Sequence, residues 1–155
     1  MVDVHNKQSR HKNMAAIRSK NTKPERYVRR RLASLGFRYL INVKGLPGTP
    51  DIVLKKYKAV ILVNGCFWHG HQCHLFQLPK TRTEFWKTKF QANTNRDKRV
   101  ARELTGLGWR VLTIWECSLK GPKRLTEGEL SERLEEWLLN SSNNSEVTST
   151  GILPS

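Results

Sequence analysis

Apolar residues recur at helical spacing in three segments of the chain. This period predicts helices over residues 22–35, 83–107 and 126–139, each with one apolar face. Thr22 and Glu25 form a capping box at the start of the first helix, and capping alone is enough to account for this glutamate. Glycines lie where the first two helices are expected to end.

Between these helices the pattern changes to short apolar runs bounded by turn residues. Strands are predicted over residues 37–43, 51–56, 59–65 and 109–116. The third run is almost wholly apolar and is expected at the centre of the sheet. The resulting order α-β-β-β-α-β-α predicts an α/β fold with a mixed central β-sheet flanked by helices. Residues 66–82 have no period and are expected to form a long loop, which compact domains rarely keep without a functional reason.

Length and composition predict one folded domain between two polar segments. The chain has 155 residues, of which 37% are hydrophobic, enough for a core of its own. Residues 22–140 are expected to form the domain, residues 1–21 a basic arm, and residues 141–155, which are rich in Ser, Asn and Thr, a flexible tail. The chain has no membrane-length apolar run and no secretory signal, so we expect a cytoplasmic protein.

The charge of the chain predicts a polyanionic partner. Its 28 Lys and Arg residues outnumber 13 Asp and Glu residues, for a formal charge of +15. The excess lies mainly in residues 1–44, whereas residues 121–155 are acidic, so the last helix is expected to face away from nucleic acid. A structural RNA-binding protein would carry a similar charge, and charge alone does not separate it from a DNA-binding protein.

Cysteines and histidines gather in the long loop, which predicts a metal site. A tetrahedral structural zinc takes four such ligands. The candidates are Cys66, Cys73 and Cys117 with one of His69, His71 and His74. Their spacing is not that of a zinc finger and does not choose among the histidines. The alternative is a set of ordinary buried thiols and surface histidines, which the local density of ligands makes less attractive.

Two acidic residues are candidates for catalysis. Asp51 opens a strand directly after Gly-Thr-Pro, where a ligand such as Mg²⁺ could reach its carboxylate, although a solvated turn aspartate is the commoner explanation. Asp97 lies on the apolar stripe of the long helix and therefore needs a partner. An ion pair with Arg or Lys, or a hydrogen bond to a catalytic histidine, would provide one.

Two aromatic residues stand within the metal-rich loop. Phe67 and Trp68 could stack on or between bases, or they could cover a small core under the loop. Met14 in the basic arm is a second candidate for insertion between bases, although a lone methionine usually serves packing.

Six segments together resemble the very short patch repair endonuclease (Vsr) family. They are SRHKNMAAIRSKNTKPE, GLPGTPDIVL, NGCFWHGHQC, TRTEFWKTKF, NTNRDKR and LGWRVLTIWEC, in the order in which the family has them. The resemblance implies a restriction-endonuclease-like fold and a Mg²⁺-dependent enzyme that nicks DNA next to the thymine of T·G mismatches, which arise by deamination of 5-methylcytosine. It also implies double-stranded DNA as partner, with mismatch-repair proteins and a repair polymerase as further candidates. We expect a monomer, located with the nucleoid.

The resemblance also assigns roles to individual residues. Asp51 would hold magnesium together with the backbone carbonyl of Val63, and His69, oriented by Asp97, would be the general base. The zinc ligands would be Cys66, His71, Cys73 and Cys117. The DNA contacts would be made by Met14, Phe67, Trp68, Trp86 and Asn93. Glu25 remains a further catalytic candidate.

The chain departs from the family pattern at two neighbouring positions. Val63 and Asn64 stand where the best-known members have Thr and His. Only the main chain of residue 63 is needed, whereas the missing histidine at 64 removes a second proton-transfer group and is expected to slow the reaction. Two alternatives remain open: a zinc-stabilised DNA-binding module without catalysis, and a related nuclease with another specificity.

Overall fold

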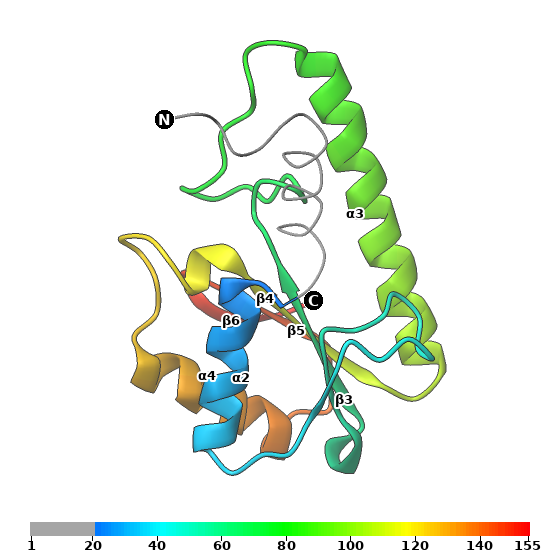
Figure 1. The fold of residues 1–155 in the computed structure, drawn as a ribbon, viewed down its shortest axis with the longest axis vertical. Coiled ribbons are helices and arrows are strands. Elements are labelled where there is room, and N and C mark those ends of the chain that lie inside the picture. Colours follow the sequence, from blue (N-terminus) through cyan, green and yellow to red (C-terminus); the bar gives the residue numbers. More distant parts are fainter. Residues whose placement is uncertain (1–20) are drawn as a thin grey trace, which may run out of the picture.

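The structure, a computed structural model, describes residues 21–155. Within this range three α-helices pack on a six-stranded sheet (Figure 1). The helices are α2 (Lys23–Ser34), α3 (Thr83–Gly106) and α4 (Glu127–Asn140). The strands are β1 (Leu40–Ile41), β2 (Ile52–Leu54), β3 (Ala59–Asn64), β4 (Arg110–Trp115), β5 (Ser145–Thr148) and β6 (Gly151–Pro154). Two short 3₁₀ turns follow β2 and β4, namely η1 (Lys55–Tyr57) and η2 (Glu116–Ser118).

The sheet is mixed, as the sequence predicts. Its strands lie in chain order, with antiparallel pairs at both edges and parallel pairing of β4 with both β3 and β5 at the centre. Helix α3 connects β3 to β4, and α4 connects β4 to β5. Since β3 and β4 are parallel and Asn64 pairs with Trp115, the segments that follow both strands leave the sheet at the same edge.

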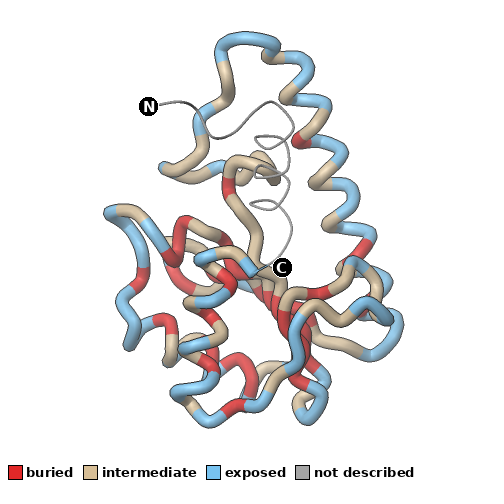
Figure 2. The backbone as a smooth tube through the Cα atoms, in the orientation of Figure 1, coloured by how far each residue is buried: buried red, intermediate tan, exposed pale blue. Residues whose placement is uncertain are grey.

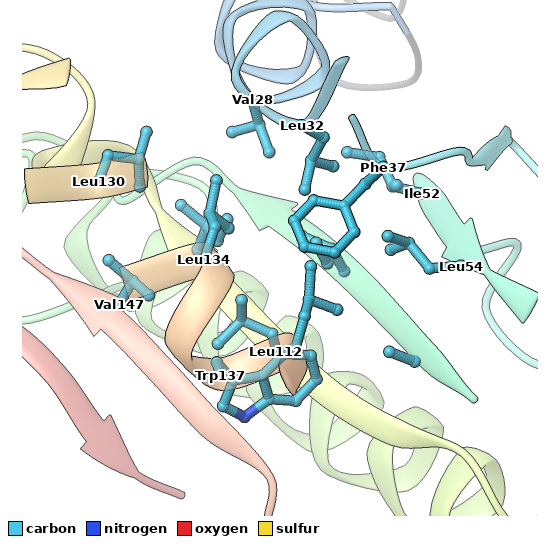
Figure 3. Packing of buried hydrophobic residues seen from close by; sticks show 14 of the residues in the cluster. Val28, Leu32, Phe37, Ile52, Leu54, Leu112, Leu130, Leu134, Trp137 and Val147 are labelled. Carbon is cyan, nitrogen blue, oxygen red and sulfur yellow. The ribbon is translucent and has the colours of Figure 1, made fainter. Parts of the chain in front are cut away.

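The two faces of the sheet are covered by different helices. Side chains alternate between the faces along each strand, so Ile61 contributes to the core under α2 and α4, while Val60 contributes to the core under α3. Figure 3 shows the larger core, in which Leu32 of α2 and Trp137 of α4 approach the sheet. This core holds β3 and β4 rigidly, and therefore also the edge at which they end.

Helix α3 is longer than the sheet face that it covers. Its buried residues are Phe90, Val100 and Leu104. The helix extends past the sheet at its N-terminal end, where most of its residues are exposed and the loop after β3 runs beside it (Figures 1 and 2). This half of α3 is therefore stabilised by contacts with the loop and not by the central core.

The C-terminal segment differs from the expected flexible tail. Residues 145–148 form β5 beside β4, and Val147 is fully buried. The strand is short and its other residues are polar, so its composition resembles that of a disordered tail. Only pairing with β4 reveals it. The domain therefore extends beyond residue 140.

Two other local features also differ from the prediction. The strand predicted over residues 37–43 is reduced to β1, because only Leu40 and Ile41 pair with β2. At the start of α2, Thr22 accepts a hydrogen bond from the Glu25 amide as in a capping box, but the Glu25 carboxylate accepts from the amide of Asn21 instead of that of Thr22. The second capping box, at Thr126 and Glu129, is complete.

Candidate active site and metal centre

The loop after β3 folds back on itself at the edge where β3 and β4 end. The amide of His69 donates to the carbonyl of Gly65 over 3.3 Å, and the amide of His71 donates to that of Cys66 over 2.9 Å. Gly70, between the two histidines, has a φ of +60° and passes close to Phe90 of α3. The sequence Cys-Phe-Trp-His-Gly-His is thereby compressed into two tight turns that direct successive side chains differently.

Four side chains of the metal-rich loop and of η2 converge in one cluster. The ligand atoms of Cys66, His71, Cys73 and Cys117 all lie within 4.8 Å of one another. Cys117 arrives from η2 because η2 follows β4, the parallel neighbour of β3. Neither His69 nor His74 belongs to the cluster, so the geometry selects one histidine where the spacing had left three.

The chemistry of this cluster fits a zinc ion. Three thiols and one imidazole are a common ligand set of structural zinc, and separations of this size suit a tetrahedral site. Burial raises the pKa of the Cys66 and Cys117 thiols, and burial lowers the pKa of His71. Without a cation the cluster would therefore stay protonated at its thiols, whereas a bound cation would favour the thiolates.

His69 points to helix α3. Its Nδ1 atom lies 2.5 Å from Oδ2 of Asp97, which stands 28 positions later in the chain. The main chain beside it is also bound to the helix, because Asn93 donates to the Trp68 carbonyl and Thr94 donates to that of His69. A carboxylate that accepts from Nδ1 fixes the tautomer with the lone pair on Nε2, the arrangement that a general base requires.

Asp51 and Glu25 form an acidic centre, separate from the Cys/His cluster. Oδ2 of Asp51 accepts a hydrogen bond from the Val63 amide over 2.8 Å, which ties β2 to the end of β3. Burial, together with the neighbouring charge of Glu25, raises the pKa of Asp51 to about 7. Glu25 is itself only 2% exposed. Asp51, Glu25 and Asp97, the three acids that the sequence singled out, therefore each have a side-chain partner.

This acidic centre fits a divalent cation. Two carboxyl groups that share a hydrogen bond in a desolvated position repel each other when both are ionised. A hard cation such as Mg²⁺ prefers oxygen ligands and would relieve that repulsion. A cation bound there would favour the ionised form of Asp51, which burial and Glu25 otherwise disfavour.

The aromatic residues of the loop pack against α3. Phe67 contacts Trp68, Phe76, Trp86 and Phe90, with ring centroids between 5.2 and 6.5 Å apart. Trp68 also lies near Trp86, at 6.2 Å. Both loop residues remain partly exposed. The two interpretations of Phe67 and Trp68 are therefore compatible, since one cluster packs the loop and leaves aromatic surface at its rim. Met14 lies outside the described residues.

Four residues near the site escaped the sequence interpretation. Trp115 stacks on His71, and its indole N–H donates to Glu146. Glu116 accepts from the amide of Cys66, and Thr94 supports His69 as described above. Trp115 and Glu116 directly precede Cys117 in the segment LGWRVLTIWEC, and this position could have marked them as residues of the site. Glu146 lay in the expected tail, and nothing in its local sequence marks it.

Comparisons with known proteins find relatives among DNA endonucleases. The family model described as "DNA mismatch endonuclease Vsr" matches residues 2–75. The chain is 45% identical to the "DNA mismatch endonuclease Vsr" of Escherichia coli (strain K12) over 98% of this chain and 97% of that protein. It is 50% identical to the "Type II nicking enzyme V.XorIIP" of Xanthomonas oryzae pv. oryzae over 68% of this chain and 78% of that enzyme.

A solved structure shares the fold. The "Homing Endonuclease I-Bth0305I Catalytic Domain" aligns with 79% of this chain and 100% of its own, with a TM-score of 0.50 and 25% identity. The predicted nuclease-like mixed sheet is thereby confirmed. Among the described residues there is no helix with the length and apolarity needed to cross a membrane.

Proposed function

Because the chain belongs to the Vsr family of DNA mismatch endonucleases and so acts in very short patch repair, we propose the following division of labour among its residues. The enzyme cuts one phosphodiester next to the thymine of a T·G mismatch and leaves a 5′-phosphate and a 3′-hydroxyl. The observation that carries this proposal is the pairing of His69 with Asp97 beside the strand ends that hold Asp51.

His69 is the general base. With Nδ1 bound to Asp97, its Nε2 accepts a proton from the attacking water, and the carboxylate of Asp97 stabilises the imidazolium that forms. The main-chain bonds from Asn93 and Thr94 keep the ring in place while DNA binds. Because Asp97, Asn93 and Thr94 already fix His69 and its main chain, little conformational entropy is lost when the imidazole reaches the reactive geometry.

Asp51 holds the catalytic cation, which we take to be Mg²⁺. Glu25 adds a second carboxyl beside it. The backbone carbonyl of Val63, whose amide donates to Asp51, would be a further oxygen ligand. When bound, magnesium would neutralise the charge that develops on the scissile phosphate. The protein contributes a buried, preformed pair of carboxyl groups, so little reorganisation is needed on binding.

The Cys66, His71, Cys73 and Cys117 cluster binds zinc and has a structural role. Zinc there would hold the loop in shape and present Phe67 and Trp68 to DNA from one side while His69 faces the phosphate from the other. Trp86 packs against Phe67, and Asn93 donates to the carbonyl of Trp68. Trp86 and Asn93 therefore contact DNA themselves or support the residues that do. Unstacking costs least at a mispair, which favours T·G sites.

The remaining expectations follow from a single active site. One catalytic centre cuts one strand, so a monomer is sufficient. Met14 and the basic residues before the domain would contact DNA, and other mismatch-repair proteins and a repair polymerase would act on the nick. Such an enzyme would work in the cytoplasm, on the nucleoid.

The test is a nicking assay on a labelled T·G duplex with Asp51→Ala and His69→Ala. Each variant should bind the duplex within about threefold of wild type but nick it at least 10²-fold more slowly, as expected for loss of a general base or a cation ligand. Glu135→Ala, an exposed residue of α4, is the control and should nick normally. Silent Asp51 and His69 variants would instead support a DNA-binding module without catalysis.

A second assay compares specificity. Wild type should nick T·G duplexes in the presence of Mg²⁺ and leave the fully paired duplex of the same sequence intact. Equal cutting of both duplexes would indicate a nuclease of another specificity. Omission of magnesium from a protein that retains zinc should abolish nicking, because only the acidic centre loses its cation.

A further inference from the structure

The C-terminal hairpin, residues 145–154, is built against the end of β4. Its first strand pairs with β4 in register, with Glu146 opposite Thr113, and its second strand closes it from outside. Val147 is fully buried, and the side chain of Asn144 accepts from the Val111 amide over 2.9 Å. The hairpin is thus held in a fixed position relative to the strand that leads into the metal cluster.

A side chain of this hairpin binds the last residue of β4. The indole Nε1 of Trp115 donates to Oε1 of Glu146 over 2.8 Å. Trp115 is only 8% exposed, so an indole N–H without an acceptor would be costly. This bond fixes the plane of the indole ring two residues before the ligand Cys117.

The same indole contacts the rings of His69 and His71 in the loop. It stacks on His71 with centroids 4.1 Å apart and an angle of 6° between the planes. It meets His69 edge to face at 5.8 Å and 79°. A rotation of the indole would therefore disturb one metal ligand and the general base together.

The tip of the hairpin reaches a second ligand. The main chain of Ser149 acts on the Cys117 thiol and lowers its pKa, against the effect of burial. Hydrogen bonds to a metal-binding sulfur hold it in position and favour its thiolate form. The hairpin thus supports two of the four ligands, one through a side chain and one through the main chain.

We propose that Glu146 is a positioning residue which, through Trp115, holds His71 for zinc and His69 for catalysis, so that the C-terminal hairpin is part of the active-site support. This inference rests on the proposed function for its catalytic part only. Its zinc part depends on the ligand cluster and is measured without DNA.

The first experiment measures zinc release from the full-length zinc-loaded protein into a chromogenic chelator. Loss of a residue that supports a metal ligand typically costs about 10- to 100-fold in metal affinity or activity. Glu146→Ala should release zinc at least tenfold faster than wild type, at a temperature where circular dichroism shows both proteins folded. Release at the wild-type rate would overturn the proposal.

The conservative variant Glu146→Gln separates hydrogen bonding from charge, because the Glu146 carboxylate also acts electrostatically on His71. An amide oxygen can still accept from the indole, so zinc release should stay within about threefold of wild type. Release as fast as from Glu146→Ala would mean that charge, and not the bond to Trp115, is responsible, and the proposal would be wrong. Glu135→Ala is again the exposed control.

A double-variant cycle tests the route through the indole. In Trp115→Phe, which keeps an aromatic ring but has no N–H, the further change Glu146→Ala should add less than twofold to zinc release. In single-turnover nicking, Glu146→Ala should lower the rate constant at least fivefold while the affinity for T·G DNA stays within twofold. Additive effects on zinc release, or an unchanged rate constant, would refute the route. If wild type fails to nick at all, the proposed function fails while the zinc result stands.

Discussion

The imidazole of His69 is bound by the carboxylate of Asp97, and this contact joins the metal-rich loop to helix α3. The two residues come from parts of the chain that the sequence interprets separately, a loop without period and an amphipathic helix. Their pairing gives a partner to Asp97, the carboxylate on the apolar stripe of the helix. It also gives the histidine a defined tautomer, from which the first prediction follows.

Asp97→Asn should reduce single-turnover nicking by about 10²-fold or more with little effect on DNA affinity. The amide can donate to Nδ1, which would move the proton to Nε2 and remove the base. The bonds from Asn93 and Thr94 keep the loop in place, so binding should persist. Glu103→Gln, on the exposed side of the same helix, is the control. A nicking rate within twofold of wild type would exclude the proposed role.

Stability without magnesium should depend on the ionisation of Asp51. Because its folded-state pKa is raised from 3.8 to about 7, the group contributes stability below pH 3.8 that is lost as the pH rises to 7. At pH 8 the folded protein carries a buried carboxylate beside Glu25. Asp51→Asn should therefore raise the free energy of unfolding at pH 8 by about 2–4 kcal/mol, and much less at pH 4.

Urea unfolding of zinc-loaded protein at the two pH values measures this effect. Glu135→Gln should change stability equally little at both. Added magnesium should stabilise wild type at pH 8 and leave Asp51→Asn largely unaffected. Greater stability of wild type than of Asp51→Asn at pH 8 without magnesium would contradict the elevated pKa.

Zinc binding should distinguish two histidines three residues apart. His71→Ala removes a ligand and should lower zinc content well below one ion per chain. It should also lower Tm by about 10 °C, since loss of several kcal/mol shifts a domain of this size by that amount. His74→Ala, outside the cluster, should retain zinc and Tm. Metal analysis and thermal melts of both variants test this prediction. Equal zinc loss in the two variants would mean that the cluster is misassigned.

Gly70→Ala should destabilise the loop. A left-handed φ costs a residue with a side chain about 1–2 kcal/mol. The added methyl would also lie 3.0 Å from Cβ of Phe90, on a helix that cannot easily move. We expect a loss of about 2–3 kcal/mol in urea unfolding, with slower nicking. Gly128→Ala, a helical position with open space around it, should be neutral or slightly stabilising. Similar behaviour of the two variants would argue against the tight turn.

Much of the scaffold follows from local patterns. The helical period predicts α3 almost to its ends, and the apolar run before Asn64 predicts the central strand β3. Local pattern fails for β5, because three of its four residues are polar and its one buried residue, Val147, is recognised only beside β4. Strand pairing is a long-range property, and a strand of four residues is too short for its pattern to indicate it.

The sequence by itself determined the chemical inventory of the site: three thiols with nearby imidazoles, Asp51 at a strand start, Asp97 on a helix, and the family to which these motifs belong. The tertiary structure decided which groups meet. It brought His71 and not His74 to the three thiols, as the family resemblance but not the spacing had indicated. It also paired Asp51 with Glu25, and it placed Glu146 where it accepts the indole N–H of Trp115. The reason is that side-chain chemistry is a local property of the chain. Distances between segments are set by the parallel pairing of β3, β4 and β5, which brings distant residues to one edge of the sheet.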